Sequence, residues 1–350
     1  MTQWLGGIGI VIFFIALMPI LKIGGVNIYK TDSSGPNNDK ISPRIKDTAR
    51  NIWYIYLFLT ISLALILYFL GMNFYDAINH SFTTISTGGF STKNIGIAYF
   101  KNPIIEYVLI IFMILSSVTF ILHYKLFKLK INKDFFSTEF KYYCLFIFLS
   151  TICIFGFLYS EISNFEEVFR KSLFSVVVTI STTGFTNYDY LNWPVFTHWV
   201  ILILMICGGM SGSTAGGAKC IRVASAIRLL FRELKQLLHP NAVLAIKTDD
   251  RVIDNKIATA IWGFLFLYLF VFFIVTGFFT MEGIDIVSAM SASISALSNI
   301  GPALGSFGPY DNFYSLSDYS KIVFSAAMLL GRLEFFTILV LLTKDFWKRY

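Results

Sequence analysis

Three segments of this chain share one pattern: TTISTGGFS at 83–91, VTISTTGFT at 178–186 and SALSNIGPA at 295–303. Each segment follows a long apolar stretch and a short amphipathic one. When the three are aligned, Gly89, Gly184 and Gly301 coincide, with a serine three positions earlier and threonine or asparagine two positions earlier. Self-similarity of this kind is the signature of a repeated structural unit. The segments therefore predict a chain built from copies of one unit.

The composition excludes an ordinary soluble domain. Hydrophobic residues make up 56% of the 350 residues and charged residues only 14%, which is far from the usage of globular proteins. Apolar stretches of roughly 20 residues are long enough to cross a bilayer. We therefore expect a multi-pass membrane protein with seven spans, at about 3–21, 51–71, 103–124, 142–159, 196–208 continuing into 218–238, 257–280 and 320–343.

The basic residues give the spans an orientation. Lysine and arginine number six in 22–50, five in 125–141 and eight in 219–256, but none occurs between 281 and 318. Because Lys and Arg mark cytoplasmic connections, the glycine segments fall on the external side and the C-terminus is cytoplasmic. These connections also account for the net charge of +7, so the charge requires no nucleic-acid partner.

Each glycine segment ends a stretch that is too short to cross the membrane and too apolar to be an exposed loop. These stretches are 72–86, 165–181 and 283–298. Non-helical backbone at membrane depth persists only where it is buried in protein or lines a watery cavity. We therefore expect each unit to contain a helix, a short re-entrant helix, a glycine turn and a returning helix, with Ser and Thr hydroxyls bonded behind the turn.

A turn of this kind suits the passage of a monovalent cation. Backbone carbonyls can replace the water around the ion without adding a fixed charge, and glycine adopts the φ values that aim consecutive carbonyls inward. A single such turn could equally mark a packing site between helices, which also favours small residues. Three copies in one frame on the external side favour a selectivity filter.

The fifth span is interrupted by ten residues that include five glycines. Each glycine would cost about 1 kcal/mol inside a helix, so we expect the span to break near the middle of the membrane. A broken helix below a filter can serve as a gate, and a Gly-rich packing seam between helices is the alternative. The gating glycines would be Gly208, Gly209, Gly212, Gly216 and Gly217.

Arg332 lies in the middle of the last apolar span, and Glu334 follows two residues later. A charge at this depth costs at least about 3 kcal/mol and usually faces an interior or a cavity. Glu334 is a poor partner, because residues two apart point to different faces of a helix. Arg332 is therefore expected to face the protein interior or a cavity, and an ion pair with another buried carboxylate is the alternative.

No catalytic constellation accompanies these features. The sequence GMSG at 209–212 matches the GxSG pattern of intramembrane serine proteases. Such a nucleophile needs a histidine base on a nearby later span, and neither 257–280 nor 320–343 contains one. We expect no enzyme activity, no bound cofactor and no metal ion other than the cation that passes through the filter.

The glycine segments, the opening TQWLGGIGI, the Gly-rich CGGMSGSTAGGAK and the closing AMLLGRLEFF resemble the Trk/Ktr/HKT superfamily of cation transporters, and within it the TrkH-like potassium uptake subunits. The resemblance implies an all-α membrane protein with a pseudo-fourfold repeat of helix, pore loop and helix around one pore. It also implies potassium uptake across the bacterial inner membrane, an intramembrane gating loop at the Gly-rich segment, and a barrier at Arg332. The implied K⁺ ligands are the carbonyls of Thr87, Gly88, Gly89, Thr182, Thr183, Gly184, Asn299, Ile300 and Gly301.

The same resemblance implies two protein partners. One is a TrkA-like nucleotide-binding regulatory subunit that contacts the cytoplasmic surfaces, including 228–254, and the other is a second copy of the chain in a homodimer. Segment 228–254 is basic and amphipathic at its start and continues into the β-like VLAIK. Contact with anionic lipid headgroups is the alternative for this segment.

In the family, TQWLGGIGI belongs to the second helix of the first unit. The chain then divides into the end of that unit at 1–50, a second unit at 51–130, a third with the interrupted helix at 131–240 and a fourth at 241–350. Seven spans with a cytoplasmic C-terminus also place Met1 outside, which a missing N-terminal part with an odd number of spans would resolve. The chain is expected either to transport potassium or to be a truncated or split-gene fragment that conducts only with a separately supplied first filter loop.

Overall fold

The structure of the protein is a computed structural model that describes residues 1–12, 45–127, 137–162, 164–242, 247–248, 251–252, 255–333, 335–341 and 343–347. Within these ranges the chain is helical apart from its connections and one small hairpin, in which β1 Lys247–Thr248 pairs antiparallel with β2 Arg251–Val252. The expected all-α class is confirmed. The predicted β-like VLAIK starts at residue 243, and its first four residues lie outside the described ones.

The helices are α1 Thr2–Ile12, α4 Ile45–Phe69, α5 Phe74–Ile85, α6 Pro103–Ser117, α7 Phe120–Phe127, α8 Thr138–Leu158, α9 Phe165–Ile180, α10 Val195–Cys207, α11 Cys220–Leu238, α12 Asn255–Met281, α13 Ile286–Ser298, α14 Asp318–Arg332, α15 Phe335–Leu341 and α16 Lys344–Trp347. Short 3-10 helices lie in the connections: η2 Gly96–Phe100, η4 Tyr190–Asn192, η5 Gly305–Phe307 and η6 Phe313–Ser315.

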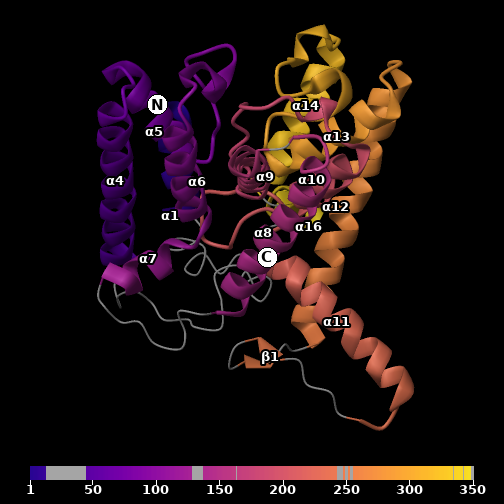
Figure 1. The fold of residues 1–350 in the computed structure, drawn as a ribbon. Coiled ribbons are helices and arrows are strands. Elements are labelled where there is room, and N and C mark those ends of the chain that lie inside the picture. The colour runs from indigo at the N-terminus through magenta and orange to yellow at the C-terminus, as the bar shows by residue number, and fades with distance from the viewer. Residues whose placement is uncertain are drawn as a thin grey trace.

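One order of elements occurs three times along the described chain: a long helix, a short helix, a glycine turn and a returning helix. The sets are α4, α5 and α6, then α8, α9 and α10, then α12, α13 and α14. Each short helix packs against its own long helix. In Figure 1 the violet first set and the orange and yellow third set lie on opposite sides of the molecule, while α11 extends beyond the helical body at the end where β1 lies.

The short helices begin where an Asn or Asp side chain caps them. Asn73, Asn164 and Asp285 each occupy the N-cap and accept a hydrogen bond from a backbone N–H two or three residues later. A cap of this kind stabilises a helix start by about 1 kcal/mol. The predicted re-entrant stretches are therefore helical, and each helix ends at its glycine turn.

The membrane spans agree with the prediction in part. Among the described residues, three helices are long and apolar enough to cross a membrane, and the bent pair α6 and α7 makes a fourth if it is counted as one span. The fifth predicted span is interrupted as expected, because α10 ends at Cys207 and α11 begins at Cys220. Of the first predicted span, 3–21, only the part within α1 lies in the described residues.

Segment 103–124, expected to be one span, is not one straight helix. The chain bends by 102° between α6 and α7. At the bend the Ser117 carbonyl accepts the Met210 N–H at 2.9 Å, and the Phe120 N–H donates to the Gly212 carbonyl at 3.2 Å. The Gly-rich segment therefore satisfies backbone groups that the break leaves without helical partners.

The last apolar stretch, 320–343, is likewise not one continuous helix. Arg332 is the final residue of α14, and α15 begins at Phe335, so Arg332 lies at a helix end rather than in mid-helix. The end of α14 packs directly onto the end of α13, because a Cβ on Gly331 would lie 1.9 Å from the Leu297 carbonyl oxygen. Glu334 lies outside the described residues.

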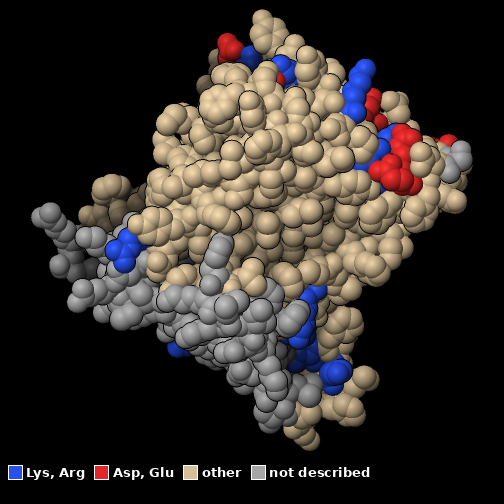
Figure 2. Space-filling model, turned by 60° about the vertical axis from the view of Figure 1, so that its left-hand side comes forward, with Lys and Arg blue, Asp and Glu red and all other residues tan. Residues whose placement is uncertain are grey.

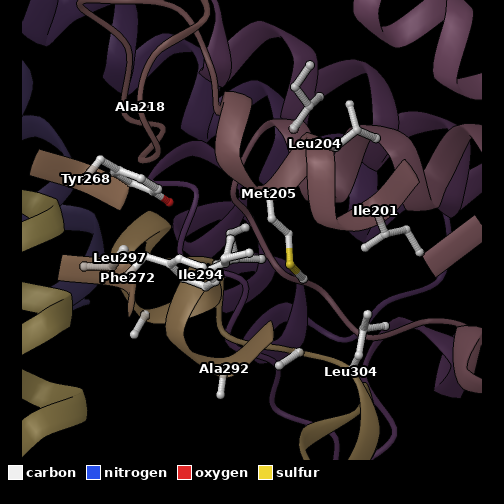
Figure 3. Packing of buried hydrophobic residues seen from close by; sticks show 14 of the residues in the cluster. Ile201, Leu204, Met205, Ala218, Tyr268, Phe272, Ala292, Ile294, Leu297 and Leu304 are labelled. Atoms are coloured by element: carbon white, nitrogen blue, oxygen red, sulfur yellow. The ribbon is translucent and has the colours of Figure 1, made fainter. Parts of the chain in front are cut away.

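The largest apolar core lies between α10, α12 and α13 (Figure 3). In a membrane, helices associate through close van der Waals contact and hydrogen bonds, because lipid is as apolar as the side chains. A second cluster forms around α1, where Trp4 donates its indole N–H to the Thr60 hydroxyl at 3.0 Å and accepts from the Tyr56 hydroxyl through its carbonyl at 2.9 Å. Side chains of the first core are Ile201, Leu204, Met205, Tyr268, Phe272, Ile294 and Leu297.

The outer surface of the long helices is apolar. Figure 2 shows a tan middle band, with blue and red side chains toward the upper part of this face and blue ones toward its lower part. Such a band matches the hydrocarbon layer of a bilayer, and the chain is a multi-pass membrane protein. Exposed side chains on these helices include Phe58 and Leu65 of α4, Phe148 and Ile152 of α8, and Phe266, Phe270 and Phe273 of α12.

Candidate ion filter and gate

The three glycine turns, residues 86–89, 181–184 and 298–301, share one backbone conformation. In each turn the residue after the serine and the final glycine both have positive φ, a conformation that favours glycine and tolerates asparagine. Threonine at this position in two turns is a strained choice that the surroundings must hold in place. The φ values are 51° and 67° at Thr87 and Gly89, 54° and 74° at Thr182 and Gly184, and 56° and 110° at Asn299 and Gly301.

The N–H groups of the turns point back into the short helices. Gly88 and Gly89 donate to the Thr83 carbonyl at 2.7 and 3.4 Å, and Thr183 and Gly184 donate to Val178 in the same way. In the third turn, Ile300 donates to the Ser295 carbonyl and Gly301 to the Ser295 hydroxyl. Because N–H and C=O point in opposite directions across a trans peptide, the carbonyls of the two residues before each glycine face away from the helix.

The turns lie directly against one another in chain order. A Cβ on Gly89 would lie 1.8 Å from the Thr183 oxygen, and a Cβ on Gly184 would lie 1.9 Å from the Ile300 oxygen. Because Gly89 and Gly184 have no side chain, the carbonyl of the next turn can lie directly against each of them. Around Gly301 no described atom outside its immediate chain neighbours lies within 4 Å of the corresponding position.

Helix α1 reaches the free side of the first turn. The Gln3 side-chain amide donates to the Gly88 carbonyl at 3.1 Å. A Cβ on Gly7 would lie 2.9 Å from the Ser86 side chain, so α1 packs closely along this turn. The structure therefore brings all nine predicted filter residues into three adjoining turns.

Hydroxyl groups support the turns from behind, as expected. Ser86 donates to the Phe82 carbonyl at 2.8 Å, Ser181 shares a hydrogen bond with Thr183 at 2.8 Å, and Ser298 shares one with Tyr268 at 2.8 Å. All three serines are buried. The partner differs from turn to turn, although the position of the serine does not.

An ion-pair network joins α6 and α9 near their N-terminal ends, and sequence reasoning missed it. Arg170 donates to the Glu106 carboxylate at 2.6 Å, to Glu166 at 2.8 Å and to the Tyr188 hydroxyl at 2.7 Å. Arg170 and Glu106 are both buried. Hydrogen bonding to Arg170 lowers the pKa of Glu166 from its ordinary value. A charged residue inside an otherwise apolar re-entrant stretch was the available signal.

The Gly-rich loop, residues 208–219, folds back on itself between α10 and α11. A Cβ on Gly208 would lie 2.9 Å from the Gly217 Cα, so the two ends of the loop touch. The Glu139 carboxylate of α8 accepts the Ser211 N–H at 2.7 Å, and the Lys219 ammonium donates to the Ala215 carbonyl at 2.5 Å. Glu139 and Lys219 were missed in the sequence; the lone acid that starts an apolar stretch was the signal for Glu139.

This loop contacts all three glycine turns. The Thr87 hydroxyl donates to the Thr214 carbonyl at 2.9 Å, and the Gly216 N–H donates to the Thr182 hydroxyl at 2.7 Å. A Cβ on Gly216 would lie 2.2 Å from the Ser298 oxygen. The predicted gating glycines therefore lie in a loop that packs beneath the turns, on the side of the basic helix α11.

Arg332 lies at the same loop. Its guanidinium donates to the Thr214 carbonyl at 2.8 Å. Within the part of the chain that the structure describes, no carboxylate forms an ion pair with Arg332. The sequence left open an ion pair between Arg332 and a buried carboxylate. In the described residues a backbone carbonyl of the Gly-rich loop is its partner instead.

Comparison with known proteins agrees with this arrangement. The family model described as "TrkH: Cation transport protein" matches residues 1–155 and 147–349. The Trk system potassium uptake protein TrkH of Escherichia coli K12 is 39% identical over 352 residues, which cover 99% of this chain and 72% of that protein, and its namesake from Halomonas elongata is 37% identical. The crystal structure of the potassium transporter TrkH from Vibrio parahaemolyticus superposes with a TM-score of 0.86 at 35% identity, covering 99% of this chain and 71% of the other. The chain belongs to the TrkH family of cation transport proteins.

Proposed function

We propose that this chain takes up potassium ions across the bacterial inner membrane, through a filter of backbone carbonyls closed from the cytoplasmic side by the Gly-rich loop. Its similar relatives are named potassium uptake proteins, and the family is one of transporters, so the chain is not an enzyme. The observation that carries the filter is the direct contact between successive glycine turns, in which Gly89 faces the Thr183 carbonyl and Gly184 faces the Ile300 carbonyl.

The chemistry of the filter follows from the direction of its peptides. A potassium ion gives up its water only where oxygen dipoles replace it, and the carbonyls that face away from α5, α9 and α13 supply such dipoles. The C-terminal ends of these helices add partial negative charge at the turns. In this cyclic order, the carbonyl of a fourth turn would lie beside Gly301, and its glycine would lie beside the Gly88 carbonyl, which accepts from Gln3 of α1.

The gate follows from the contacts of the Gly-rich loop. The loop is held beneath the filter by Thr87, Thr182 and Arg332, so an ion leaving the filter meets the loop first. The guanidinium of Arg332 adds a positive charge at this point, which raises the energy of a passing cation. Outward movement of the loop would remove both obstacles.

Wider parts of the proposal rest on the family resemblance. The four regions 1–50, 51–130, 131–240 and 241–350 would act as one partial and three complete pore units. A TrkA-like nucleotide-binding subunit would bind the cytoplasmic surface, and two copies of the chain would form a homodimer. The chain spans 72% of the length of its Escherichia coli relative.

Transport by this chain alone is tested by growth and by flux. A bacterium without its own potassium uptake systems should grow at low potassium when it expresses the chain. Purified protein in potassium-loaded liposomes should take up external ⁸⁶Rb⁺ when an outward potassium gradient makes the interior negative. Growth and flux at the level of the empty vector, with the protein present in the membrane, would contradict the proposal. That outcome would favour a fragment that needs a separately supplied first filter loop.

Replacement of the charge at the gate should increase uptake. Arg332→Gln removes the guanidinium and its hydrogen bond to Thr214, and because a bond to a charged group contributes about 1.5–3 kcal/mol, we expect ⁸⁶Rb⁺ influx to rise about ten-fold. Lys321→Gln, at a partly exposed lysine of the same helix α14, is the control and should leave influx unchanged. Equal influx in the two variants would argue against a gating role for Arg332.

A further inference from the structure

Two threonine side chains connect the filter to the gate. The Thr87 hydroxyl donates to the Thr214 carbonyl at 2.9 Å, while the Thr182 hydroxyl accepts the Gly216 N–H at 2.7 Å. Both threonines are buried. The corresponding residue of the third turn, Asn299, donates instead to the Met328 carbonyl of α14 at 3.0 Å. Hydroxyl contacts to the Gly-rich loop are thus specific to the first two turns.

Thr214 extends this connection beyond the filter. Its hydroxyl lies 3.0 Å from the Ile85 carbonyl at the end of α5 and 3.1 Å from the Ser116 carbonyl at the bend of α6. Its own carbonyl accepts from both Thr87 and Arg332. A buried polar group that loses its partner costs more than the bond contributes. The position of the loop therefore depends on these hydroxyl contacts.

The same hydroxyl oxygens are suitable ligands for a dehydrated cation. A threonine hydroxyl carries two lone pairs, and it lies here at the end of the filter nearest the loop. With the loop in place, the Gly216 N–H points at the Thr182 oxygen, and the Thr87 hydroxyl shares its hydrogen between the Thr214 carbonyl at 2.9 Å and the Ser86 carbonyl at 2.7 Å. A cation at this end would need the oxygens that these bonds engage.

We propose that Thr87 and Thr182 hold the Gly-rich loop in its closed position, and that a monovalent cation at the inner end of the filter competes with the loop for their hydroxyl oxygens. Arrival of the ion then releases the Gly216 N–H and lets the Thr87 hydroxyl turn its oxygen toward the ion. The two threonines are positioning residues for the gate and ligands of an inner cation site. The competition with a permeating ion rests on the proposed transport function; the attachment of the loop does not.

Hydrogen–deuterium exchange of the full-length chain in nanodiscs tests the proposal without requiring transport. Exchange is measured on peptides that cover 208–219, in K⁺ and in choline at equal ionic strength. We expect K⁺ to accelerate exchange of these peptides in the unmodified protein. Thr182→Val should accelerate exchange in choline about ten-fold, since it removes the partner of a buried N–H, and should abolish the effect of K⁺ there.

Two variants separate the hydroxyl from general stability. Thr182→Ser keeps the oxygen and should retain both the protection and its dependence on K⁺. Thr179→Val removes a buried hydroxyl of the preceding helix α9, which donates to the Ser175 carbonyl within that helix, and should leave loop exchange unchanged. If Thr182→Val does not yield folded protein, Thr87→Val with Thr84→Val as its control provides the same comparison, because the Thr84 hydroxyl bonds within α5 to His80.

The outcomes are distinct for the two proposals. Loop exchange that is the same in Thr182→Val and Thr179→Val, or the same in K⁺ and choline for the unmodified protein, overturns the proposed competition. ⁸⁶Rb⁺ flux in liposomes made from the same preparations reports on transport separately. Exchange that depends on K⁺ without any flux would support the inner site while contradicting the proposed uptake.

Discussion

Gly184→Ala is expected to abolish potassium uptake. The φ of Gly184 is 74°, and a Cβ at this position would lie 1.9 Å from the carbonyl oxygen of Ile300. Real Cβ atoms do not approach a backbone oxygen this closely, so the third turn must move away and the carbonyls no longer converge. Uptake of ⁸⁶Rb⁺ into liposomes should fall to the level of liposomes without protein, and growth at low potassium should be lost.

Two further glycines make the comparison quantitative. Gly301 has a φ of 110° but no described atom close to a Cβ, so Gly301→Ala introduces backbone strain of about 1–3 kcal/mol without a collision and should retain partial uptake. Gly277 lies within α12 with nothing within 4 Å, and Gly277→Ala should transport like the unmodified protein. Normal uptake by Gly184→Ala would contradict the assignment of Gly184 to the filter.

The glycine turns could be predicted from sequence because their geometry restricts residue type. Positive φ at Gly89, Gly184 and Gly301 leaves little choice other than glycine, and asparagine at position 299 suits the same region. The interrupted fifth span was predictable for a related reason, since five glycines in ten residues oppose a helix. In both cases the backbone conformation limits which residue types can occupy the position, so the sequence reveals it.

The contacts of the Gly-rich loop could not be predicted in this way. The loop donates to the backbone carbonyls of Ser117 and Ile85, and its own Thr214 carbonyl accepts from Arg332. A carbonyl is present at every residue, so the sequence does not mark these contacts. The bend between α6 and α7 depends on this docking, so the apolar run 103–124 gave no sign of it. The sequence singled out Arg332, and within the described residues its hydrogen-bond partner is a backbone oxygen of the Gly-rich loop.

The ion pair between Arg170 and Glu106 was missed for a different reason. The two residues are 64 positions apart, and only the packing of α9 against α6 brings them together. Sequence alone suggests solvated charges near the external surface for both. Their burial changes the energetics, because a buried charge is tolerated only with a partner of opposite sign.

Arg170→Gln is therefore expected to destabilise the protein strongly. Loss of the guanidinium leaves the Glu106 carboxylate buried beside the Tyr188 hydroxyl alone, and removal of one member of a buried pair costs about 3–5 kcal/mol. The neighbouring Lys171 pairs with Glu167 in a more exposed i, i+4 arrangement, so Lys171→Gln should cost no more than about 0.5 kcal/mol. The free energy of unfolding is measured by SDS titration in mixed micelles.

A double variant shows whether the destabilisation comes from the unpaired carboxylate. Replacing both members by apolar residues of similar size is often neutral or stabilising, so Arg170→Met combined with Glu106→Leu should recover most of the stability that Arg170→Gln loses. The loss of stability in the double variant is then smaller than the sum of the losses in the two single variants, which indicates a favourable interaction between Arg170 and Glu106. If the double variant is as unstable as Arg170→Gln, the loss comes instead from the contacts of Arg170 with Glu166 and Tyr188, and the buried carboxylate of Glu106 is not its cause.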